Sequence, residues 1–590
     1  MKRTNQAARI PACRPLCAGI ASLLALSAPI AFAAPSVWQV TSCDDAGAGS
    51  LRDVIGAGTT LSGDTVDLSG LTKCTDSTIS LSTGEILIKQ DDLTILGPGK
   101  AALTVDGTKL PGGSTNFADS RLFTHNGNGT LTLTDISLAN GHVYHTGNGY
   151  PARGGCIYSS KHVILQSSDV IGCSAYSGAD QASGGGIFTK GNLTLQKSTV
   201  TKNSALGSGQ TQGGGAASEG SITVIDSVIS ANTANSSPQF VRGGGLYAFG
   251  SATLTHSQLA GNAATAYTSF AEGGGIYTRG NLTLAYATLT GNTTTTTNNG
   301  TCGGGAASFG NIGATYSTID GNYAGGQPQA TSGGGMCLLG NFTMFRSTVS
   351  GNITTGQAGA IQKSNNCVGC NWTLLLRDST VSGNQANLSG GIYSAATHTK
   401  LYNSTIAFNT ATLSKVGVPG SYFYESPGVT ISAFNEPVDV TIHSMIISNN
   451  SYGAGVENDF GVVAIKPVTF NAGPAHSLIR VSGVAGLPTG IMSGACPLLG
   501  PLRDNGGLTK THALQSTSPA IDSGDNLPIG FATLDVYDQR GSALANGELD
   551  YLRVSGPIGD PVPLPDIGAY EVQQDDVIFN AGHEGCAELP

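Results

Sequence analysis

The densest group of side chains that could bind a metal lies near the C-terminus, where carboxylates recur close to glycines. The group consists of Asp522, Asp525, Asp538, Asp566 and Glu571. Carboxylate oxygens in such turns are ligands that Ca²⁺ accepts, so the four aspartates are calcium candidates. The other interpretation, which we favour, is that these carboxylates cap turns and pair with Arg540 inside a terminal segment. On that interpretation the protein needs no cofactor.

Two shorter motifs also carry side chains capable of chemistry. His142-Val-Tyr-His145, followed by Tyr150, could hold a metal or supply a base, although we favour a solvated loop. Cys367-Val-Gly-Cys370 has the spacing of a redox pair or of half a zinc site. Because no second Cys-x-x-Cys accompanies it, we expect a structural disulfide or unpaired thiols there.

A repeat in the middle of the chain must position the other residues. Gly250, Gly280, Gly310 and Gly340 fall thirty residues apart, and each begins a short segment of the type Gly-Asn-Leu-Thr-Leu. A triple glycine and a closing asparagine recur with nearly the same spacing. A unit of about thirty residues without helical periodicity closes only by stacking on copies of itself. The spacing therefore predicts a solenoid.

Within each repeat, apolar and small polar residues alternate with period two, which is typical of strands with one buried face. Glycine and asparagine suit the sharp corners between them, so we expect three short strands per coil, paired in parallel. The expected columns are an aliphatic stack of Leu254, Leu284 and Met344 and a corner ladder of Asn262, Asn292, Asn322 and Asn352. Ligand contacts or glycosylation are the alternative use of such asparagines. Arg242 and Glu272 hold the same repeat position and would form a surface ion pair.

Residues 1–33 predict export. Basic residues precede an apolar stretch that ends in Ala31-Phe32-Ala33, the small-x-small pattern of a signal peptidase site, so we expect cleavage after Ala33. The alternative is a retained membrane anchor, but the stretch is shorter than the roughly 20 apolar residues that span a bilayer. No later segment is a better candidate, so we expect no transmembrane span in the mature chain.

Three segments follow the signal peptide. We expect an N-terminal cap, a parallel β-helix and a C-terminal covering segment at residues 34–84, 85–490 and 491–590. The amphipathic run from Gly49 to Ile55 predicts a short helix in the cap. The C-terminal segment should cover the other end of the solenoid, because an open coil exposes unpaired strand edges and apolar interior.

Removal of the signal peptide leaves ten cysteines, an even number that fits an oxidising compartment. Cys43 and Cys74 bracket the N-terminal segment, and Cys496 and Cys586 bracket the C-terminal one. We predict these two disulfides. Composition excludes other partners: the chain of 590 residues is 11% charged with a net charge of -10, and no basic run follows the N-terminus. Nucleic acid is therefore not an expected partner.

Several C-terminal motifs carry a resemblance to a known family. They are Leu502-Arg-Asp-Asn-Gly-Gly-Leu-Thr, Ser518–Gly524, Asp538–Gly541 and Asp566–Glu571. These motifs resemble the choice-of-anchor Q family of bacterial surface or secreted proteins, and the coils are loosely similar to repeats of polymorphic outer-membrane proteins. The resemblance implies a right-handed parallel β-helix, of the pectin lyase-like kind, on an exported protein. It implies no activity, and whether the chain is released or attached to the surface stays open.

Two functions compete. β-Helix lyases and glycoside hydrolases need clustered carboxylates, either to bind calcium or to act as acid and base. In the repeats Glu219, Asp226, Glu272 and Asp320 occupy different positions, so we lean against an enzyme. The favoured hypothesis is an adhesin or structural binding module for polysaccharide or cell-surface partners. Only 6% of the residues are aromatic, and two are tryptophan, so no sugar-stacking platform is expected.

Overall fold

The computed structural model describes residues 34–110, 117–147, 149–365, 368–412, 425–453, 455–525, 537–541, 551–553, 564–573 and 586. The predicted signal peptide and its cleavage site at Ala33 lie outside the described residues. The chain forms two compact units, Met1–Pro35 and Ser36–Pro590. The fold below is that of the second unit.

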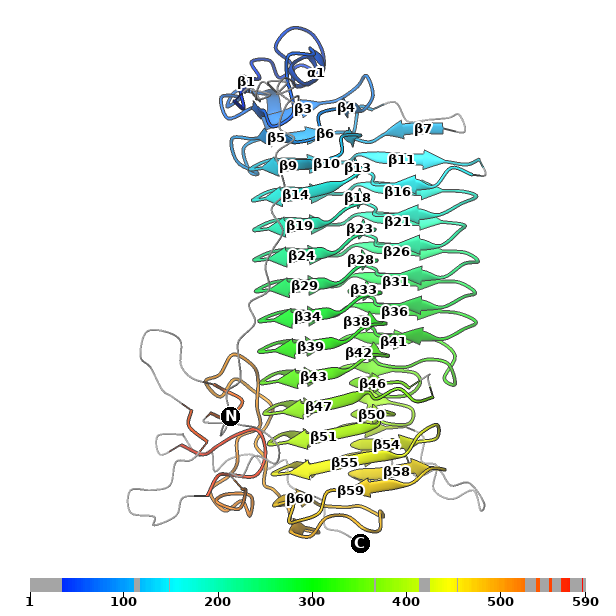
Figure 1. Ribbon diagram of the computed structural model, residues 1–590, viewed down its shortest axis with the longest axis vertical. Coiled ribbons are helices and arrows are strands. Elements are labelled where there is room, and N and C mark those ends of the chain that lie inside the picture. The colour runs from blue at the N-terminus through cyan, green and yellow to red at the C-terminus, as the bar shows by residue number, and fades with distance from the viewer. Residues whose placement is uncertain are drawn as a thin grey trace, which may run out of the picture. The chain divides into compact units, whose positions relative to one another are not determined.

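The unit Ser36–Pro590 is an all-β solenoid of about thirty residues per coil, as the glycine spacing predicts (Figure 1). One regular coil runs through β33 (Ile276–Thr278), β34 (Leu282–Ala285), β35 (Thr288–Thr290), β36 (Thr293–Thr296) and β37 (Thr301–Cys302). These five strands belong to five different sheets, which we name C, A, B, D and E in that order. The coil therefore has five short strands where the sequence predicts three. Residues in the left-handed region interrupt the chain at more than one point, in this coil at Tyr286 between sheets A and B and at Gly291 between sheets B and D, with φ 53° and 60°.

Equivalent strands of successive coils pair in parallel. Sheets A and B hold 15 strands each, sheet C holds 13, sheet D 12 and sheet E six. One described pair is antiparallel, β7 (Phe117–Ser120) with β11 (His142–His145). In sheet A, Leu254 pairs with Leu284, and Met344 follows two coils later. All three side chains are buried, which confirms the predicted aliphatic stack.

The predicted asparagine ladder is present and longer than expected. Its members are Asn203, Asn232, Asn262, Asn292, Asn322, Asn352, Asn384, Asn409 and Asn450. Each amide donates through Nδ2 to the Oδ1 atom of the next, as at Asn292 and Asn322, which are 2.9 Å apart. The second proton of Asn292 Nδ2 goes to the carbonyl of Leu259, also at 2.9 Å. Each interior amide thus satisfies its hydrogen bonds within the stack.

The structure explains why glycine is needed at each position of the triple glycine, as residues 273–275 illustrate. Gly273 has φ +67°, a conformation that glycine adopts freely. A Cβ atom on Gly274 would lie 2.3 Å from the carbonyl oxygen of Gly304 in the next coil. On Gly275 it would lie 2.6 Å from the carbonyl oxygen of Gly305 in the next coil and 3.1 Å from the amide carbon of Asn292. The third glycine therefore makes room for the asparagine ladder.

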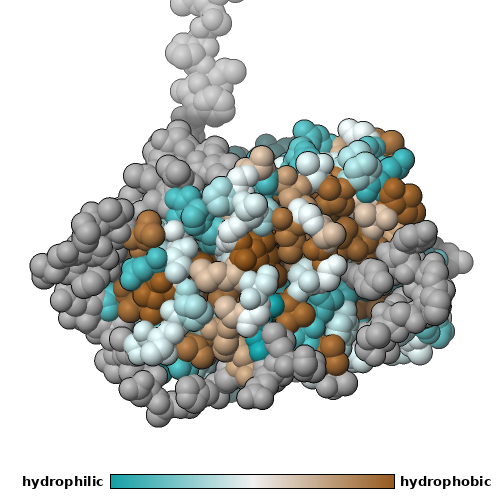
Figure 2. All heavy atoms as spheres, turned by 90° about the horizontal axis from the view of Figure 1, so that it is seen from below, coloured by the Kyte–Doolittle hydropathy of each residue, from teal (hydrophilic) through white to brown (hydrophobic). Residues whose placement is uncertain are grey.

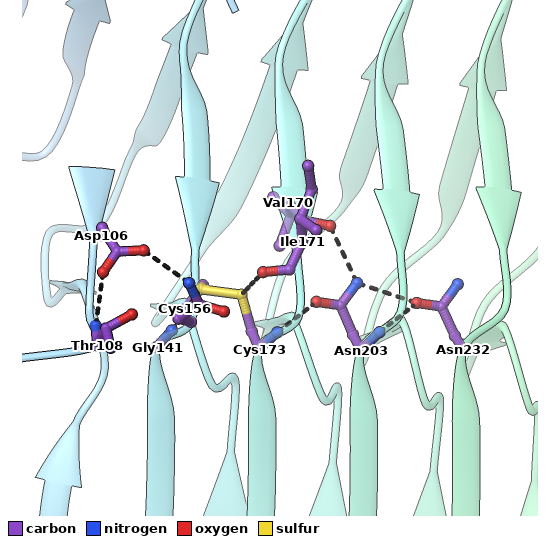
Figure 3. The surroundings of a disulfide bond; sticks show 10 residues. Asp106, Thr108, Gly141, Cys156, Val170, Ile171, Cys173, Asn203 and Asn232 are labelled. Carbon is purple, nitrogen blue, oxygen red and sulfur yellow. Dashed lines mark hydrogen bonds between the residues drawn. A yellow bond between two sulfur atoms is a disulfide. The ribbon is translucent and has the colours of Figure 1, made fainter. Parts of the chain in front are cut away.

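One coil has cysteines in place of both the third glycine and the ladder asparagine. Cys156 stands in the position of the third glycine and Cys173 in that of the ladder asparagine, and the two form a disulfide. Figure 3 shows this bond at the head of the ladder, where the amide N–H of Cys173 donates to Asn203 Oδ1 at 2.9 Å. The replacement of a glycine and an asparagine of the repeat by two cysteines in the same coil is therefore the sequence signal for this disulfide.

Parallel pairing begins within the segment 34–84. Its strands β1 (Val37–Gln39), β2 (Thr65–Asp67) and β3 (Thr78–Ser80) already belong to sheets A and B. The predicted short helix is α1 (Leu51–Gly56), whose first turn is capped by the Ser50 side chain accepting from the Asp53 amide. Its residues Leu51 and Ile55 are buried in the core, so the helix covers apolar side chains at this end.

The opposite end is closed by the last turns of the solenoid itself. Val484, Leu487 and Ile491 pack against the core there, next to β60 (Ser477–Ile479) and β61 (Ile491–Met492). The view from the side of β60 shows apolar and polar residues interspersed on this surface (Figure 2). The described residues after Cys496 have another position.

The C-terminal segment covers a flank of the solenoid. Its contacts run along the outer face of sheet B, over β44 (Thr348–Ser350), β48 (Thr380–Ser382) and β52 (Thr405–Ala407). Thr348 Oγ1 donates to the Lys510 carbonyl at 2.7 Å, and Thr380 Oγ1 donates to Gln539 Oε1 at 2.6 Å. The described residues after Cys496 thus contact this flank of the solenoid, and closure of the end by the rest of the segment stays a prediction. Sheet B bears small hydroxyl side chains here, at Thr348, Thr380 and Thr405, which let the C-terminal segment approach closely.

Candidate functional site

Sheets E and C meet at the triple glycines, and their outward side chains face each other across this inner angle. Three contacts share one geometry, each joining a sheet E residue to a sheet C residue thirty-five positions later. They are Arg153 over Phe188 at 4.8 Å, Arg242 over Tyr277 at 4.8 Å and the disulfide Cys302–Cys337 with a Cα–Cα distance of 5.5 Å. The inner angle is thus filled by matched pairs, one of which is covalent.

Arg242 is at the centre of the filled region. Its Nε atom lies 2.7 Å from Glu272 Oε2, and its guanidinium lies 4.5 Å from the ring centre of Phe240. The predicted pairing of Arg242 with Glu272 on neighbouring coils is confirmed, but the pair is partly buried and packed between rings. Burial opposes the charge of Arg242, but Glu272 together with the neighbouring tyrosines outweighs burial and raises the pKa of the guanidinium.

Two tyrosines stack beneath the arginine. The rings of Tyr247 and Tyr277 are 5.7 Å apart and parallel within 1°. Burial raises the pKa of both phenols, and the Tyr277 hydroxyl has no hydrogen-bond partner among the described residues. These side chains pair because Tyr247 and Tyr277 are in direct register on sheet C.

A row of residues just after the sheet C strands forms the exposed margin of the inner angle. The row consists of Lys190, Glu219, Phe249, Arg279 and Phe309. Phe249 and Phe309 expose 50% and 46% of their surface, and the Arg279 guanidinium lies 4.9 Å from the Phe249 ring. Phe270, 47% exposed, approaches from the sheet E side, where its carbonyl accepts from the Val241 amide. We call Phe249, Phe270, Arg279 and Phe309 the aromatic face.

This aromatic face bears on the expectation of no sugar-stacking platform, because it gathers exposed rings despite the low aromatic content. The residue count was low, but the thirty-residue register gathers phenylalanines from several coils onto one margin. The signal was available in the spacing of Phe240 to Phe270, thirty residues, and of Phe249 to Phe309, sixty. A count of aromatic residues does not take this spacing into account.

The margin and the sheet E row together carry a local positive charge. Their cations are Lys190, Arg153, Arg242 and Arg279, and their carboxylates are Glu219 and Glu272. Arg153 lies 3.9 Å from Glu219, and Arg242 pairs with Glu272. Arg279 forms no ion pair among the described residues. The excess of two positive charges contrasts with the net charge of -10 of the chain.

The C-terminal acidic residues lie in the segment that covers sheet B. Asp538 Oδ2 lies 2.8 Å from Arg540 Nη2, and the Arg540 guanidinium lies between the rings of Tyr551 and Tyr570, 4.0 Å from each. Asp566 accepts through Oδ1 from the Asp522 amide at 2.9 Å. These contacts support the favoured interpretation, in which the carboxylates cap turns and pair with Arg540.

The remaining calcium candidate, Asp525, lies near two histidines. Its Oδ2 atom is 3.8 Å from Nε2 of His443 and 3.8 Å from Nε2 of His476. Burial raises the pKa of Asp566 to about 6. Within the described residues, no group of three or more His, Cys, Asp or Glu side chains is placed to hold a metal. Binding of calcium stays a prediction.

The two shorter motifs have different outcomes. His142 and His145 lie in strand β11 and not in the loop that we favoured, and the His145 ring makes a 3.2 Å hydrogen bond with the Tyr150 carbonyl. Cys370 forms a disulfide, which fits the structural interpretation, while Cys367 lies outside the described residues.

The four carboxylates of the repeats are as dispersed as the sequence indicates. Glu219 and Glu272 border the inner angle, Asp226 lies at the corner between sheets A and B with φ 48°, and Asp320 belongs to sheet B. The two predicted disulfides are both present: Cys43–Cys74 and Cys496–Cys586 have Cα–Cα distances of 5.5 Å and 5.9 Å.

Comparison with known proteins gives no relative. No family model matches the chain, and no match is found among curated proteins or solved structures. None of the helices in the described part of the chain has the length and apolar composition needed to cross a membrane. The disulfides indicate an oxidising environment.

Proposed function

We propose that the protein is an exported binding module, secreted or held at the bacterial surface, whose aromatic face binds an extended acidic polysaccharide. The observation that carries the proposal is the continuous margin of half-exposed phenylalanines beside Arg279, a cation without an ion pair among the described residues. Aromatic rings stack on the apolar faces of sugars, and the cation attracts carboxylate or sulfate groups.

The solenoid suits a polymeric ligand in particular. Successive coils are about 4.8 Å apart, which is close to the length of one sugar unit in a chain. Residues at one repeat position in neighbouring coils can therefore contact neighbouring sugars. Phe249 and Phe309, two coils apart, would contact sugars two units apart. The local positive charge on an acidic protein selects an anionic chain and disfavours neutral ones.

The proposal places the chain outside the cytoplasm, where its disulfides are stable and polysaccharides are accessible. Membership of the choice-of-anchor Q family, cleavage after Ala33 and an adhesive role belong to the same proposal and are supported by the sequence motifs. Nucleic acid is not a proposed partner, since no basic run is present after the N-terminus.

Affinity electrophoresis of the exported protein in gels containing alginate, polygalacturonate, hyaluronate or neutral dextran tests the proposal. We expect retardation by at least one acidic polymer, weakened by salt, and none by dextran. The variants Phe249→Ala and Arg279→Ala should each reduce binding at least tenfold. Tyr286→Ala is the matched control, because Tyr286 is 40% exposed but lies at the corner between sheets A and B.

Three outcomes would contradict the proposal. They are absence of retardation by every polymer, equal losses in the Tyr286→Ala control, and depolymerisation of the polymer during the assay. The last would favour a polysaccharide lyase or glycoside hydrolase, the alternative that the sequence leaves open.

A further inference from the structure

The inner angle changes character after sheet E ends. The last strand of sheet E is β37, and its row continues only through isolated bridges from Cys302 to Ser332 and from Ser332 to Gln357. At the end of this row the Gln357 side chain lies beside Gln362, in place of an arginine between rings. A cavity of about 170 Å³ opens there, bounded by sheet C residues and by the segment around Phe434.

The cavity wall has the same register as the aromatic stack but different chemistry. On sheet C, Gln362 and Tyr393 occupy the row that Tyr247 and Tyr277 occupy earlier in the solenoid. Arginines and paired rings are replaced by amides and hydroxyls. The change in side chains therefore coincides with the loss of the sheet E partners.

Gln362 shows an unused hydrogen-bonding group at this site. The side chain is 5% exposed, and its Nε2 atom donates to Gln357 Oε1 at 3.2 Å. Its Oε1 atom is buried and has no hydrogen-bond partner among the described residues. Leaving a buried carbonyl oxygen unpaired costs roughly 1–3 kcal/mol, so a ligand hydroxyl that donates to it would be stabilised.

The other polar side chains of the wall are amides and hydroxyls together with one carboxylate. The Tyr393 hydroxyl donates to Ser432 Oγ at 2.8 Å, and burial raises the pKa of Tyr393. Glu436 is the charged side chain among the described lining residues, and its Oε1 atom accepts from the Gly369 amide at 2.7 Å. A carboxylate at the rim repels anions and accepts from hydroxyl groups.

We propose that this cavity binds a single neutral sugar unit. Its volume is that of about five or six liquid waters at roughly 30 Å³ each, which suits one sugar ring with its hydroxyls. Amide and hydroxyl groups supply donors and acceptors at matched positions, and the Tyr393 ring supplies an apolar surface. The site differs from the aromatic face in position and in the charge of its ligand, so it does not depend on the proposed function.

Saturation-transfer NMR and calorimetry on the full exported chain test the inference, with the methyl glycosides of glucose, galactose, mannose and N-acetylglucosamine as probes. We expect one of these to bind with millimolar or better affinity and methyl glucuronoside to bind at least tenfold more weakly. Gln362→Met preserves the length of the side chain and removes its hydrogen bonds, and it should weaken binding at least tenfold.

Gln212→Met is the matched control, since Gln212 is a partly exposed glutamine on sheet E beside the filled part of the inner angle. It should leave glycoside binding unchanged. Failure of every probe to bind at 50 mM, or equal affinity in Gln362→Met and the unmodified protein, would overturn the inference and leave a water-filled cavity. Phe249→Ala provides a further separation: it should weaken polysaccharide retardation without changing glycoside binding.

Discussion

The regular coils and the C-terminal segment are stabilised in different ways. Between Asn203 and Asn352, hydrogen bonds join neutral groups of adjacent coils about thirty residues apart. The C-terminal segment binds its flank through charges and distant contacts: Arg553 Nη2 lies 2.6 Å from Asp378 Oδ1, 175 residues away, and both side chains are buried. One region repeats a modest interaction many times, and the other depends on a few strong ones.

This difference has a thermodynamic consequence. In the solenoid each coil contacts only its neighbours, so a local defect weakens a local interface unless it prevents the backbone from stacking. In the C-terminal segment, a single unpaired charge is costly because a buried carboxylate cannot recover its hydration. We therefore expect a single substitution in the C-terminal segment to weaken the packing of that whole segment against sheet B.

Gly274→Ala should give the largest effect, because the added Cβ would lie 2.3 Å from the Gly304 carbonyl oxygen and 2.4 Å from that of Thr293. Both obstacles are backbone atoms that are fixed by coil stacking. We expect a loss of more than about 4 kcal/mol in the free energy of unfolding, or no recovery of folded protein. Urea titration followed by circular dichroism measures it.

Gly313→Ala is the control for that prediction. Gly313 lies in β39 (Ile312–Thr315) with nothing within 4 Å of the added Cβ, so alanine should be neutral or stabilise by about 0.5–1 kcal/mol. Equal destabilisation by the two changes would show that the coils tolerate no side chain at any glycine, and the argument from close backbone approach would fail.

Arg553→Met should have the next largest effect, because it removes the cation that lies 2.6 Å from the buried Asp378 carboxylate. We expect a loss of about 3–5 kcal/mol that is confined to docking of the C-terminal segment. Hydrogen exchange should accordingly rise at Thr348, Thr380 and Thr405 while sheet A stays protected. The double variant Arg553→Met/Asp378→Asn should recover much of the loss, and uniform exchange across all coils would contradict separate docking.

Asn292→Ala should cost less, about 2–4 kcal/mol, since it leaves neutral groups unpaired. Asn262 loses the acceptor of its amide N–H and of its Nδ2 group, and the Leu259 carbonyl loses a donor. Thermal unfolding measures the change. Asn281→Ala, in the exposed turn before sheet A, is the control and should cost under about 1 kcal/mol; a similar loss in both would argue against the ladder.

How far the sequence could predict this structure follows the same division. Positions that recur every thirty residues have many copies, so the aliphatic stack, the ladder and the fold could be predicted before the structure. The Arg242–Glu272 pair was also predictable from its register. The packing of Arg242 against aromatic rings was not predictable, because contacts between sheet E and sheet C residues thirty-five positions apart depend on the angle at the triple glycine.

The C-terminal segment could not be predicted to the same degree, because each of its contacts occurs once. Nothing in the local sequence indicates that Gln539 accepts from Thr380 or that Arg553 meets Asp378. The end of sheet E was equally hidden, since it follows from a shorter loop before Gln357. The amide cavity therefore required the three-dimensional arrangement.

The end of the asparagine ladder gives a prediction about pH dependence and joins the two kinds of interaction. Asn450 Nδ2 donates to Asp459 Oδ1 at 2.9 Å, so a carboxylate is the last acceptor of a column of neutral amides. The ladder directs its donors toward Asp459, yet burial outweighs these hydrogen bonds and raises the pKa of Asp459 from 3.8 to about 7. Ionisation of Asp459, at the end of the asparagine ladder, therefore lowers the free energy of unfolding by an amount that depends on pH.

Because the folded state holds the Asp459 proton more tightly than the unfolded state, stability should fall as pH rises from about 4 to about 7 and level off above that. The slope from this group is at most about 1.4 kcal/mol per pH unit. Burial lowers the pKa of His512 to about 4, which gives an opposite slope between about pH 4 and 6.5, so the whole-protein curve mixes both. The difference between the unmodified protein and Asp459→Asn isolates the aspartate. Urea midpoints at half-unit steps from pH 4 to 8 should show Asp459→Asn gaining stability relative to the unmodified protein as pH rises, and a constant difference would mean that Asp459 is ionised throughout and that the ladder's donors outweigh burial.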